Sequence, residues 1–476
     1  MLTLGGTAVA GRSVRWHRRQ PRPLREEIIA MSNAMPASRA VGIDFGTTNS
    51  VIAQATADGQ AEMVDFAMPG GVGPDGLGPG GVGSVFRSAL CFWQDEGVRG
   101  ALSHEAGPWA IAEFLDFPQG SRFLQSFKSM AANPLFEHAS LFEKRLRFED
   151  LGQIFLTHLL THGGLAISDL PDQIVIGRPV RYVGNRPDEA LARARYDAMF
   201  ALLDRPVSYV YEPLGAAYSF ASGLVDPATL LVADFGGGTS DFSIVKVQAP
   251  GAAQRCIPLG SAGVGIAGDR FDYRIMDHLV LPTLGKGGTY RSFDKTVDIP
   301  AGHFSDFGDW SRLALMRNRR TLAELDKLKR SATDPAAIAR MIAVVENELG
   351  YALYEAVGQL KRALSSESHA EFRFEGPGLS LQAEVSRSDF ERWIGPDLQR
   401  IAEAVDQALA SAGLEADEID HVFLTGGSSL IPAVRQLFEQ RFGEGRIASG
   451  NELTSIAHGL ALMGQDPDLR DWVAPD

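Results

Sequence analysis

The sequence is poor in cysteine, in excess basic charge and in long apolar runs. Cys91 and Cys256 are its two cysteines, too few for a disulfide framework or a cysteine-rich zinc site, and this scarcity suits a reducing compartment. The formal net charge of −14 argues against nucleic acid or an anionic membrane as a main partner, because both favour basic surfaces. No apolar run approaches the length of a membrane span. We therefore expect a cytoplasmic protein.

The length predicts more than one domain. A chain of 476 residues with 45% hydrophobic content is too long for one ordinary core and can bury a large one. Residues 1–38 stand apart because Arg12 to Arg25 is rich in arginine. We interpret this segment as a disordered leader or the product of a misassigned start codon, with a targeting role as the alternative. The glycine-rich stretch at 67–84 is predicted to be a surface loop.

The most informative stretch runs from Leu230 to Val247 and reads LLVADFGGGTSDFSIVKV. Two β-prone runs flank a glycine-rich turn, a pattern that predicts a hairpin. Successive glycines let backbone N–H groups approach a ligand and form an anion-binding nest, for which phosphate is the obvious ligand. Asp234 and Asp241 would repel a bare phosphate, so a hard cation between them is expected. The stretch predicts a site for a magnesium nucleotide.

A second hairpin of the same kind is predicted at Val41 to Ile52. It again passes from a strand through Asp-Phe-Gly and small hydroxyl residues into another strand. Two such hairpins, one early in the chain and one near its middle, indicate two related lobes. We expect the ligand to bind in a cleft between them.

Two further charged residues have both structural and functional interpretations. Glu212 ends a predicted strand and precedes Pro213, which is typical of a first helical turn. Its position at a carboxyl strand edge suits a ligand site, and an acid attracted by the helix dipole is the equal alternative. Lys128 lies among apolar neighbours, and taken alone it is expected to extend its charged end to solvent.

Three other nucleotide motifs are weak or absent. Gly263 to Gly268 matches GxGxxG, but it lacks the expected βαβ unit with a following acid, so a turn into a helix is the better interpretation. Asp-Phe-Gly occurs at Asp44, Asp234 and Asp306, yet a His-Arg-Asp loop is absent, which excludes a protein kinase. A Walker GxxxxGK[ST] sequence is also absent.

The later part of the chain predicts a loop-rich region at 285–310 and then one long helix. Asp334 and Pro335 suit the start of that helix, and apolar residues recur every three or four positions through Leu349 as far as Leu364. Lys361 and Ser365 lie four apart with Arg362 adjacent. This basic end suits either a helix C-terminus or contacts to ribose and phosphate.

The last motif follows a predicted strand at His421 to Leu424. Gly426 and Gly427 remove side chains at a point where a flat ligand could lie close to the backbone. A tight turn between strand and helix is the simpler alternative. A helix is expected to begin near Pro432.

In this order, the motifs closely resemble the ATPase domain of the seventy-kilodalton heat-shock chaperones, in the superfamily of actin and hexokinase. The resemblance covers about 39–464. It implies an α/β, two-lobed actin-like fold with duplicated ribonuclease-H-like cores. The expected divisions are lobe I at 39–226 with an inserted subdomain at about 67–150, lobe II at 227–450 with an insertion at about 267–396, and a C-terminal return to lobe I at 451–476.

The resemblance also implies roles for individual residues. Asp44, Asp234 and Glu212 would hold Mg²⁺, largely through water, while Lys128, Glu212, Asp234, Thr239 and Asp241 would act in catalysis. ATP or ADP would be contacted by Gly46, Thr47, Thr48, Asn49, Gly236, Gly237, Gly238, Gly268, Asp269, Lys361, Arg362, Ser365, Gly426, Gly427, Ser428 and Leu430.

Three departures from the family pattern change what is expected. Leu430 replaces an arginine that stacks on adenine, and Gly358 replaces a glutamate that meets ribose. The chain also leaves no room for a peptide-binding domain, so it looks like the short DnaK-related proteins of the YegD type. We expect a slow chaperone-like ATPase, monomeric or weakly oligomeric, that acts through a protein client or co-chaperone. A small-molecule kinase and an actin-like filament protein are the alternatives.

Overall fold

The computed structural model describes most of the chain beyond its first 39 residues. The described residues are 40–67, 82–94, 101–118, 120–182, 186–249, 252, 256–308, 313, 316–450 and 453–474. The interpretation of 1–38 as a leader, and most of the glycine-rich stretch predicted as a loop, lie outside them.

The strands are β1 (Ala40–Phe45), β2 (Asn49–Ala55), β3 (Ala61–Met63), β4 (Phe66–Ala67), β5 (Val82–Gly83), β6 (Phe86–Arg87), β7 (Ala89–Gln94), β8 (Leu102–Ala106), β9 (Ser121–Gln125), β10 (Ala139–Leu141), β11 (Lys144–Leu146), β12 (Ile174–Arg178), β13 (Val207–Tyr211), β14 (Ala228–Phe235), β15 (Ser240–Val247), β16 (Cys256–Val264), β17 (Thr289–Ser292), β18 (Lys295–Asp298), β19 (His369–Gly376), β20 (Leu379–Ser386), β21 (His421–Thr425) and β22 (Ile447–Ser449).

The α-helices are α1 (Gly107–Asp116), α2 (Phe148–His162), α3 (Glu189–Phe200), α4 (Glu212–Ala221), α5 (Gly268–Ile275), α7 (Arg319–Ser331), α8 (Pro335–Glu346), α9 (Gly350–Ser366), α10 (Arg387–Ala412), α11 (Pro432–Phe442) and α12 (Ser455–Met463). The short helical turns are η2 (Phe127–Met130), η3 (Ile167–Asp169), η4 (Ala201–Leu203), η5 (Met276–Val280), η6 (Leu281–Leu284), η7 (Ala301–Gly308), η8 (Ala416–Glu418), η9 (Gly427–Leu430), η10 (Glu444–Arg446) and η11 (Leu469–Trp472).

Two large sheets share one topology. In the first sheet the order is β13-β12-β1-β2-β3, and in the second it is β16-β15-β14-β21-β22. Each contains three antiparallel strands, followed by two strands that run parallel to the first strand of that meander. Both predicted hairpins are present, as β1–β2 and β14–β15. The predicted α/β fold with duplicated cores is therefore confirmed.

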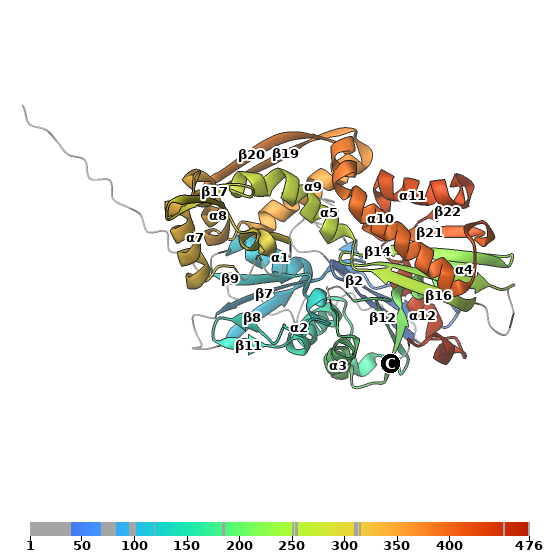
Figure 1. Cartoon of the computed structure of the whole chain (residues 1–476). Coiled ribbons are helices and arrows are strands. Elements are labelled where there is room, and N and C mark those ends of the chain that lie inside the picture. Colours follow the sequence, from blue (N-terminus) through green and yellow to red (C-terminus); the bar gives the residue numbers. More distant parts are fainter. Residues whose placement is uncertain are drawn as a thin grey trace, which may run out of the picture. The chain divides into compact units, whose positions relative to one another are not determined.

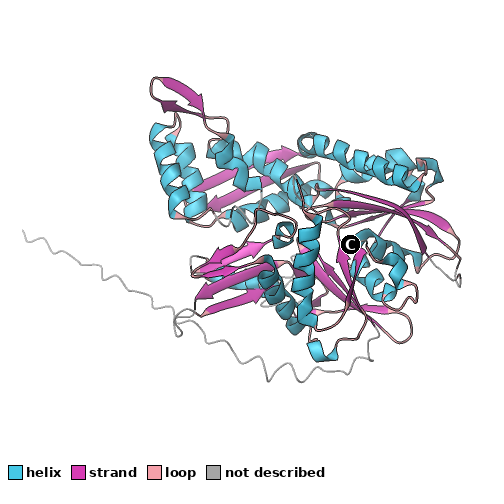
Figure 2. Cartoon of the chain, turned by 60° about the horizontal axis from the view of Figure 1, so that its bottom comes forward, coloured by secondary structure: helices cyan, strands magenta, loops and turns pink. Residues whose placement is uncertain are grey.

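Helices cover both large sheets. Figure 2 shows helices packed beside the sheets, and Figure 1 shows α10 running along the second sheet, where it contacts β15 and β16. Helix α4 contacts β14 and β15 of the second sheet, while α12 contacts β1, β2 and β12 of the first. The two helices also pack on each other, because Gly459 allows close approach: a β-carbon there would lie 1.7 Å from the carbonyl oxygen of Gly215.

The smaller sheet, of order β8-β7-β9, follows β6 in the chain. Phe114 of α1 and Phe123 of β9 belong to the same hydrophobic cluster as residues of α8 and α9. Their rings pack edge-on against Tyr351, with centroids 6.0 Å and 5.3 Å away. Apolar contacts therefore join this small sheet to helices from the second half of the chain.

Two element predictions were wrong. The long helix expected from Asp334 is broken into α8 and α9, because Glu348 has a left-handed backbone with φ of 52°. The region at 285–310, expected to be loop-rich, contains the β17–β18 hairpin and the turn η7. The β19–β20 hairpin lies between α9 and α10.

Helices of membrane-spanning length and apolarity are absent from the part of the chain that the structure describes.

Candidate functional site

The turns of the two large hairpins approach each other closely. A β-carbon built on Gly237 would lie 2.2 Å from the hydroxyl oxygen of Thr48 and 3.2 Å from Cβ of Thr47. Any larger residue would push these turns apart, so glycine at this position permits their approach. Two segments almost 190 positions apart in the chain thus meet at one place.

The first turn is held by Ser88. Its hydroxyl donates to the carbonyl oxygen of Gly46 at 2.7 Å, and its backbone N–H donates to the carbonyl oxygen of Thr48 at 2.9 Å. The buried hydroxyl of Ser50 lies 2.9 Å from the Ser88 hydroxyl. Asn49 of the same turn accepts a hydrogen bond from Arg87, at 3.1 Å. The turn conformation is therefore fixed by contacts outside the hairpin.

The second turn is tied to the start of α5. The backbone N–H of Asp269 donates to the carbonyl oxygen of Gly237 at 2.8 Å, and that of Gly268 donates to Gly236 at 3.4 Å. Within the turn, the N–H of Gly236 donates to the carbonyl oxygen of Thr239 at 3.0 Å. These bonds use N–H groups that a helix N-terminus leaves without intrahelical partners. The GxGxxG match thus serves a turn into a helix, as expected.

Four buried acids lie close together near the two turns: Asp44, Glu212, Asp234 and Asp241. Burial raises the pKa of Asp44 to about 7, with the charge of Glu212 adding to the rise and Lys128 opposing it. Burial also raises the pKa of Asp234 well above its ordinary value, helped by the charges of Glu212, Asp44 and Asp241. Desolvation and like-charge repulsion both disfavour ionised carboxylates. This group carries more negative charge than its one buried lysine can offset.

Lys128 lies on the short turn η2 and forms an ion pair with Glu212 at the start of α4. Its Nζ is 2.6 Å from Oε1 of Glu212, and both side chains are 7% exposed. The expectation that Lys128 alone would extend to solvent was therefore wrong. Burial by itself would lower the pKa of Lys128, but the charges of Glu212 and Asp44 outweigh it and leave that pKa raised. Lys128 is therefore a fixed positive charge within the acidic group.

Asp241 connects the second sheet to the segment that follows β12. Its Oδ1 accepts hydrogen bonds from the backbone N–H groups of Val180 at 2.9 Å and Arg181 at 3.2 Å. The side chain is fully buried. Burial first and the charge of Glu212 second raise its pKa to about 7, against hydrogen bonds from Thr239 and Arg181 that lower it.

The donor geometry bears on how a metal could be held here. Among the described residues, the one group of three or more His, Cys, Asp or Glu side chains with ligand atoms within 4.8 Å of one another is Glu105, His158 and His162. Asp44, Asp234 and Glu212 are thus not arranged for joint direct coordination. Mg²⁺ commonly keeps several waters and uses few carboxylates directly, so this spacing fits a hydrated ion.

A second set of predicted residues meets beside Gly268. A β-carbon on Gly268 would lie 3.1 Å from the Ser428 hydroxyl, 3.5 Å from the Gly236 carbonyl oxygen and 3.6 Å from Nζ of Lys361. Lys361 also pairs with Asp272 at 2.8 Å. The structure therefore brings together residues from the second turn, α5, α9 and η9.

The two glycines before η9 differ in their surroundings. Gly426 has φ of +82°, and a β-carbon there would lie 2.1 Å from the carbonyl oxygen of Phe235. This is the tight turn between strand and helix. A β-carbon on Gly427 would meet nothing within 4 Å, which leaves open space at that residue.

Other residues predicted to contact ATP lie outside the buried acidic group. Arg362 is exposed and pairs with Glu355 at 2.9 Å, and the Ser365 hydroxyl donates to the backbone carbonyl of Lys361 at 3.0 Å. Leu430 is 60% exposed on η9. Gly358, where the resemblance leads one to expect a glutamate, would place a β-carbon 3.6 Å from the Arg362 guanidinium. These side chains therefore do not contact the buried acidic group.

Sequence reasoning missed Arg87, Ser88 and Asp272. Arg87 and Ser88 are far in sequence from the first turn, and the pairing of β6 with β2 brings them to it. Asp272 is one helical turn beyond Gly268. That spacing was the available signal that Asp272 lies near the residues predicted to contact ATP.

Comparisons with known proteins agree with this geometry. Residues 341–466 match the family model described as "Hsp70 protein". The "Chaperone protein DnaK" of Deinococcus radiodurans is 26% identical over 458 residues, which cover 92% of this chain and 62% of that protein. A "Chaperone protein DnaK" of Thermus thermophilus is 25% identical, covering 91% of this chain and 62% of the relative.

A relative with a different name, also a chaperone, matches the chain to a similar extent. The "Chaperone protein HscA homolog" of Shewanella sediminis is 24% identical over 90% of this chain and 59% of its own length. The chain thus spans about three-fifths of the length of the curated relatives it matches. Over most of its length the chain is therefore similar to Hsp70-family chaperones, and its mixed α/β structure, with two large sheets of one topology, is consistent with their actin-like ATPase fold.

Proposed function

We propose that this chain is a chaperone-like ATPase. It binds Mg-ATP between the turn at 46–49 and the turn at 236–239, hydrolyses ATP slowly, and uses the cycle to open and close its two halves. The observation that carries this proposal is the approach of the two glycine-bearing turns directly beside the buried acids.

The chain's own residues suit a phosphate chain. Gly236, Gly237 and Gly238 provide a turn that carries no side chains, and the Thr48 hydroxyl faces it from the other hairpin, with Cβ of Thr47 beside it. Backbone N–H groups and hydroxyls are common phosphate donors, and successive glycines let them approach closely. Backbone hydrogen bonds fix the same turn to α5, so a bound ligand would require little ordering of it.

The acidic group suits a hard cation. Asp44, Asp234 and Glu212 would hold Mg²⁺ through its waters, because their carboxylates repel one another in the buried site. When bound, the ion supplies charge neutralisation for the phosphates. Lys128 stays in position through Glu212 and adds positive charge near the same place. Asp241, held by Val180 and Arg181, would with Thr239 help to position a water molecule.

The nucleoside would lie toward η9. Gly268, Ser428 and Lys361 meet near Gly236, and Gly427 adjoins open space where a base could stack against backbone. Leu430 and Gly358 replace the arginine and glutamate expected from the resemblance. Leucine cannot stack a guanidinium on the base, and glycine has no side chain to hydrogen-bond the ribose, so we expect weaker and looser binding of the nucleoside.

The relatives named as chaperones support a protein client or co-chaperone as the partner. Lobe movement is the means we propose for reaching that partner, because closure would depend on the terminal phosphate and its metal.

The test is calorimetric titration of the full chain with ATP, ADP and other nucleoside triphosphates, with and without Mg²⁺, followed by single-turnover hydrolysis. We expect magnesium-dependent binding of ATP and ADP and slow release of phosphate. Failure to bind any nucleotide would overturn the proposal. ADP release that requires a sugar or acid would indicate a kinase, and nucleotide-dependent sedimentation would indicate a filament protein.

A further inference from the structure

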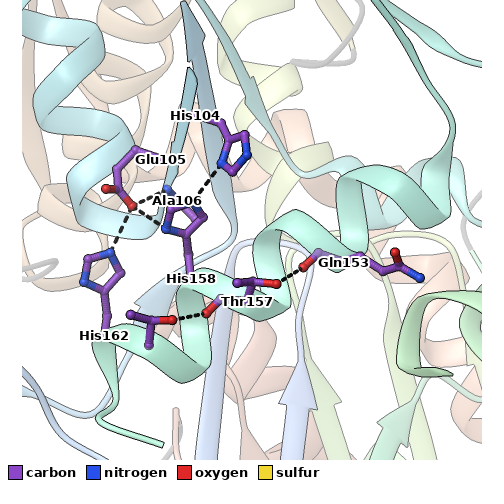
Figure 3. Close-up of polar contacts among 8 residues, drawn as sticks. His104, Glu105, Ala106, Gln153, Thr157, His158 and His162 are labelled. Carbon is purple, nitrogen blue, oxygen red and sulfur yellow. Dashed lines mark hydrogen bonds and ion pairs between the residues drawn. The ribbon is translucent and has the colours of Figure 1, made fainter. Parts of the chain in front are cut away.

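A separate cluster of ligand-type side chains lies between β8 and α2. Oε1 of Glu105 is 2.8 Å from Nδ1 of His158 and 2.9 Å from Nε2 of His162. Figure 3 shows both rings directed at this carboxylate oxygen. The ligand atoms of the three residues lie within 4.8 Å of one another. None of these residues belongs to the proposed nucleotide site.

The fold explains why these groups converge. His158 and His162 are four residues apart on α2, so their side chains lie on one face of the helix. Glu105 is on β8, which packs against α2. The backbone N–H of Ala106 donates to Oε1 of Glu105 at 3.0 Å, which holds the carboxylate in place.

Both imidazole rings are held by other contacts. Nε2 of His158 lies 2.9 Å from Nδ1 of His104, so the nitrogen that points away from Glu105 has a hydrogen-bond partner (Figure 3). The ring of His162 stacks on Trp109, with centroids 3.6 Å apart and planes 11° from parallel. Metal-binding histidines typically have such an outer partner, which fixes the ring and its tautomer.

We propose that Glu105, His158 and His162 form a binding site for a divalent transition metal, with Zn²⁺ as the best fit. Two imidazole nitrogens and one carboxylate oxygen are ligands that Zn²⁺ accepts, and three protein ligands leave a position for water. Mg²⁺ and Ca²⁺ prefer all-oxygen sites, so this ligand set selects against them. The ion would connect the small sheet to α2.

The present distances are close to those that a bound ion needs. Ligand atoms about 2.0–2.2 Å from a tetrahedral Zn²⁺ lie roughly 3.4 Å apart. The carboxylate oxygen and the two nitrogens would therefore separate by about half an ångström on binding. Any N–H that now points at Glu105 would lose its proton to solvent, since a ligating imidazole nitrogen must present its lone pair. Part-exposed side chains at Glu105 and His158, 21% and 18% exposed, give the ion access.

The inference is tested on the untagged full chain, stripped with chelator and free of nucleotide. Equilibrium dialysis against Zn²⁺ should show one tightly bound ion per chain. Substitution of Co²⁺ should give the visible absorption of a four-coordinate site and quench the fluorescence of Trp109, because that ring stacks on His162. His158→Gln and His162→Gln should each weaken Zn²⁺ binding at least about 100-fold.

The matched control is His369→Gln, because His369 is exposed on β19 and distant in sequence from the cluster. It should bind Zn²⁺ like the wild type. Equal, weak binding by the wild type and the two cluster variants would overturn the proposal and leave a hydrogen-bonded network. If a cluster variant does not fold, the wild-type stoichiometry and Co²⁺ spectrum decide alone: less than one ion per chain and no four-coordinate band overturn it. The assay contains no nucleotide, so its outcome is independent of the ATPase proposal.

Discussion

Nζ of Lys128 lies 2.6 Å from Oε1 of Glu212, although the two residues are 84 positions apart. The pair joins η2, which follows the small sheet, to the first residue of α4. A buried pair of this kind holds a charge in one orientation, and removing either partner leaves the other charge uncompensated. Lys128 is therefore held in position by a contact within the protein.

Lys128→Met should reduce ATP turnover by about 100-fold or more, with a much smaller effect on nucleotide affinity, because a fixed charge acts mainly on the transition state. Single-turnover hydrolysis and calorimetry separate the two effects. The unpaired Glu212 would also cost about 3–5 kcal/mol of stability, so unfolding must be measured alongside. Lys144→Met is the control, since Lys144 is exposed on β11. Normal hydrolysis by the Lys128 variant would contradict its assigned role.

Asp234→Asn should weaken nucleotide binding in the presence of Mg²⁺ by about tenfold or more, because it removes one charge that attracts the cation. Without Mg²⁺ the variant should bind ATP as well as the wild type or better, since one repulsive carboxylate is gone. Titrations with and without the metal test both expectations. Asp298→Asn, an exposed change on β18, should alter neither. An equal loss under both conditions would show that Asp234 acts on something other than the metal.

Asp241→Asn should change the pH dependence of stability in the nucleotide-free protein. The pKa of Asp241 is about 7 in the folded chain and about 4 when unfolded. A raised folded-state pKa stabilises the protein fully below about pH 4, and that contribution is lost as the pH rises toward 7. The asparagine variant avoids this loss and keeps an acceptor for Val180 and Arg181. Its unfolding free energy relative to wild type should therefore rise between pH 5 and pH 8.

The size of that rise is limited to a few kcal/mol, because each pH unit of pKa difference is worth about 1.4 kcal/mol. Chemical denaturation at several pH values measures it. A relative stability that stays constant from pH 5 to pH 8 would contradict a folded-state pKa of about 7 for Asp241.

Gly426→Ala and Gly427→Ala form a matched pair. Alanine at 426 combines a left-handed backbone with a β-carbon 2.1 Å from the Phe235 carbonyl, so we expect a loss of stability of more than about 2 kcal/mol. Alanine at 427 has open space and should leave thermal unfolding almost unchanged. It should instead lower nucleotide affinity if a base lies there. Equal melting temperatures for the two variants would contradict the strain at Gly426.

The parts of the fold that were predictable are those encoded locally. Alternating β-prone runs on either side of Asp-Phe-Gly predicted both large hairpins, and Pro213 marked the start of α4. The break between α8 and α9 was missed because the apolar stripe continues through Leu349, while Glu348 adopts a left-handed conformation that its side chain does not signal. Local backbone exceptions of this kind are set by tertiary contacts.

The resemblance named several residues that meet at the candidate site, but it gave neither their contacts nor Ser88 and Asp272. The resemblance named Lys128 and Glu212, yet taken alone Lys128 was expected to reach solvent, because the pairing partner is distant in sequence. The cluster at Glu105 was missed altogether. His158 and His162 are four residues apart on α2, and that spacing was a usable signal, whereas Glu105 comes to them only through packing of β8 on α2.

The break at Glu348 has a mechanical meaning under the proposed function. It places the Glu348 carboxylate 3.2 Å from Arg122 of β9 and 2.8 Å from Arg317, next to the contact of Phe123 with Tyr351. This ionic and aromatic clasp fastens the small sheet to the helices of the second half of the chain. Under the proposed function, separation of the small sheet from these helices must first break the contacts of the clasp. The strength of the clasp would therefore set the rate of ADP release.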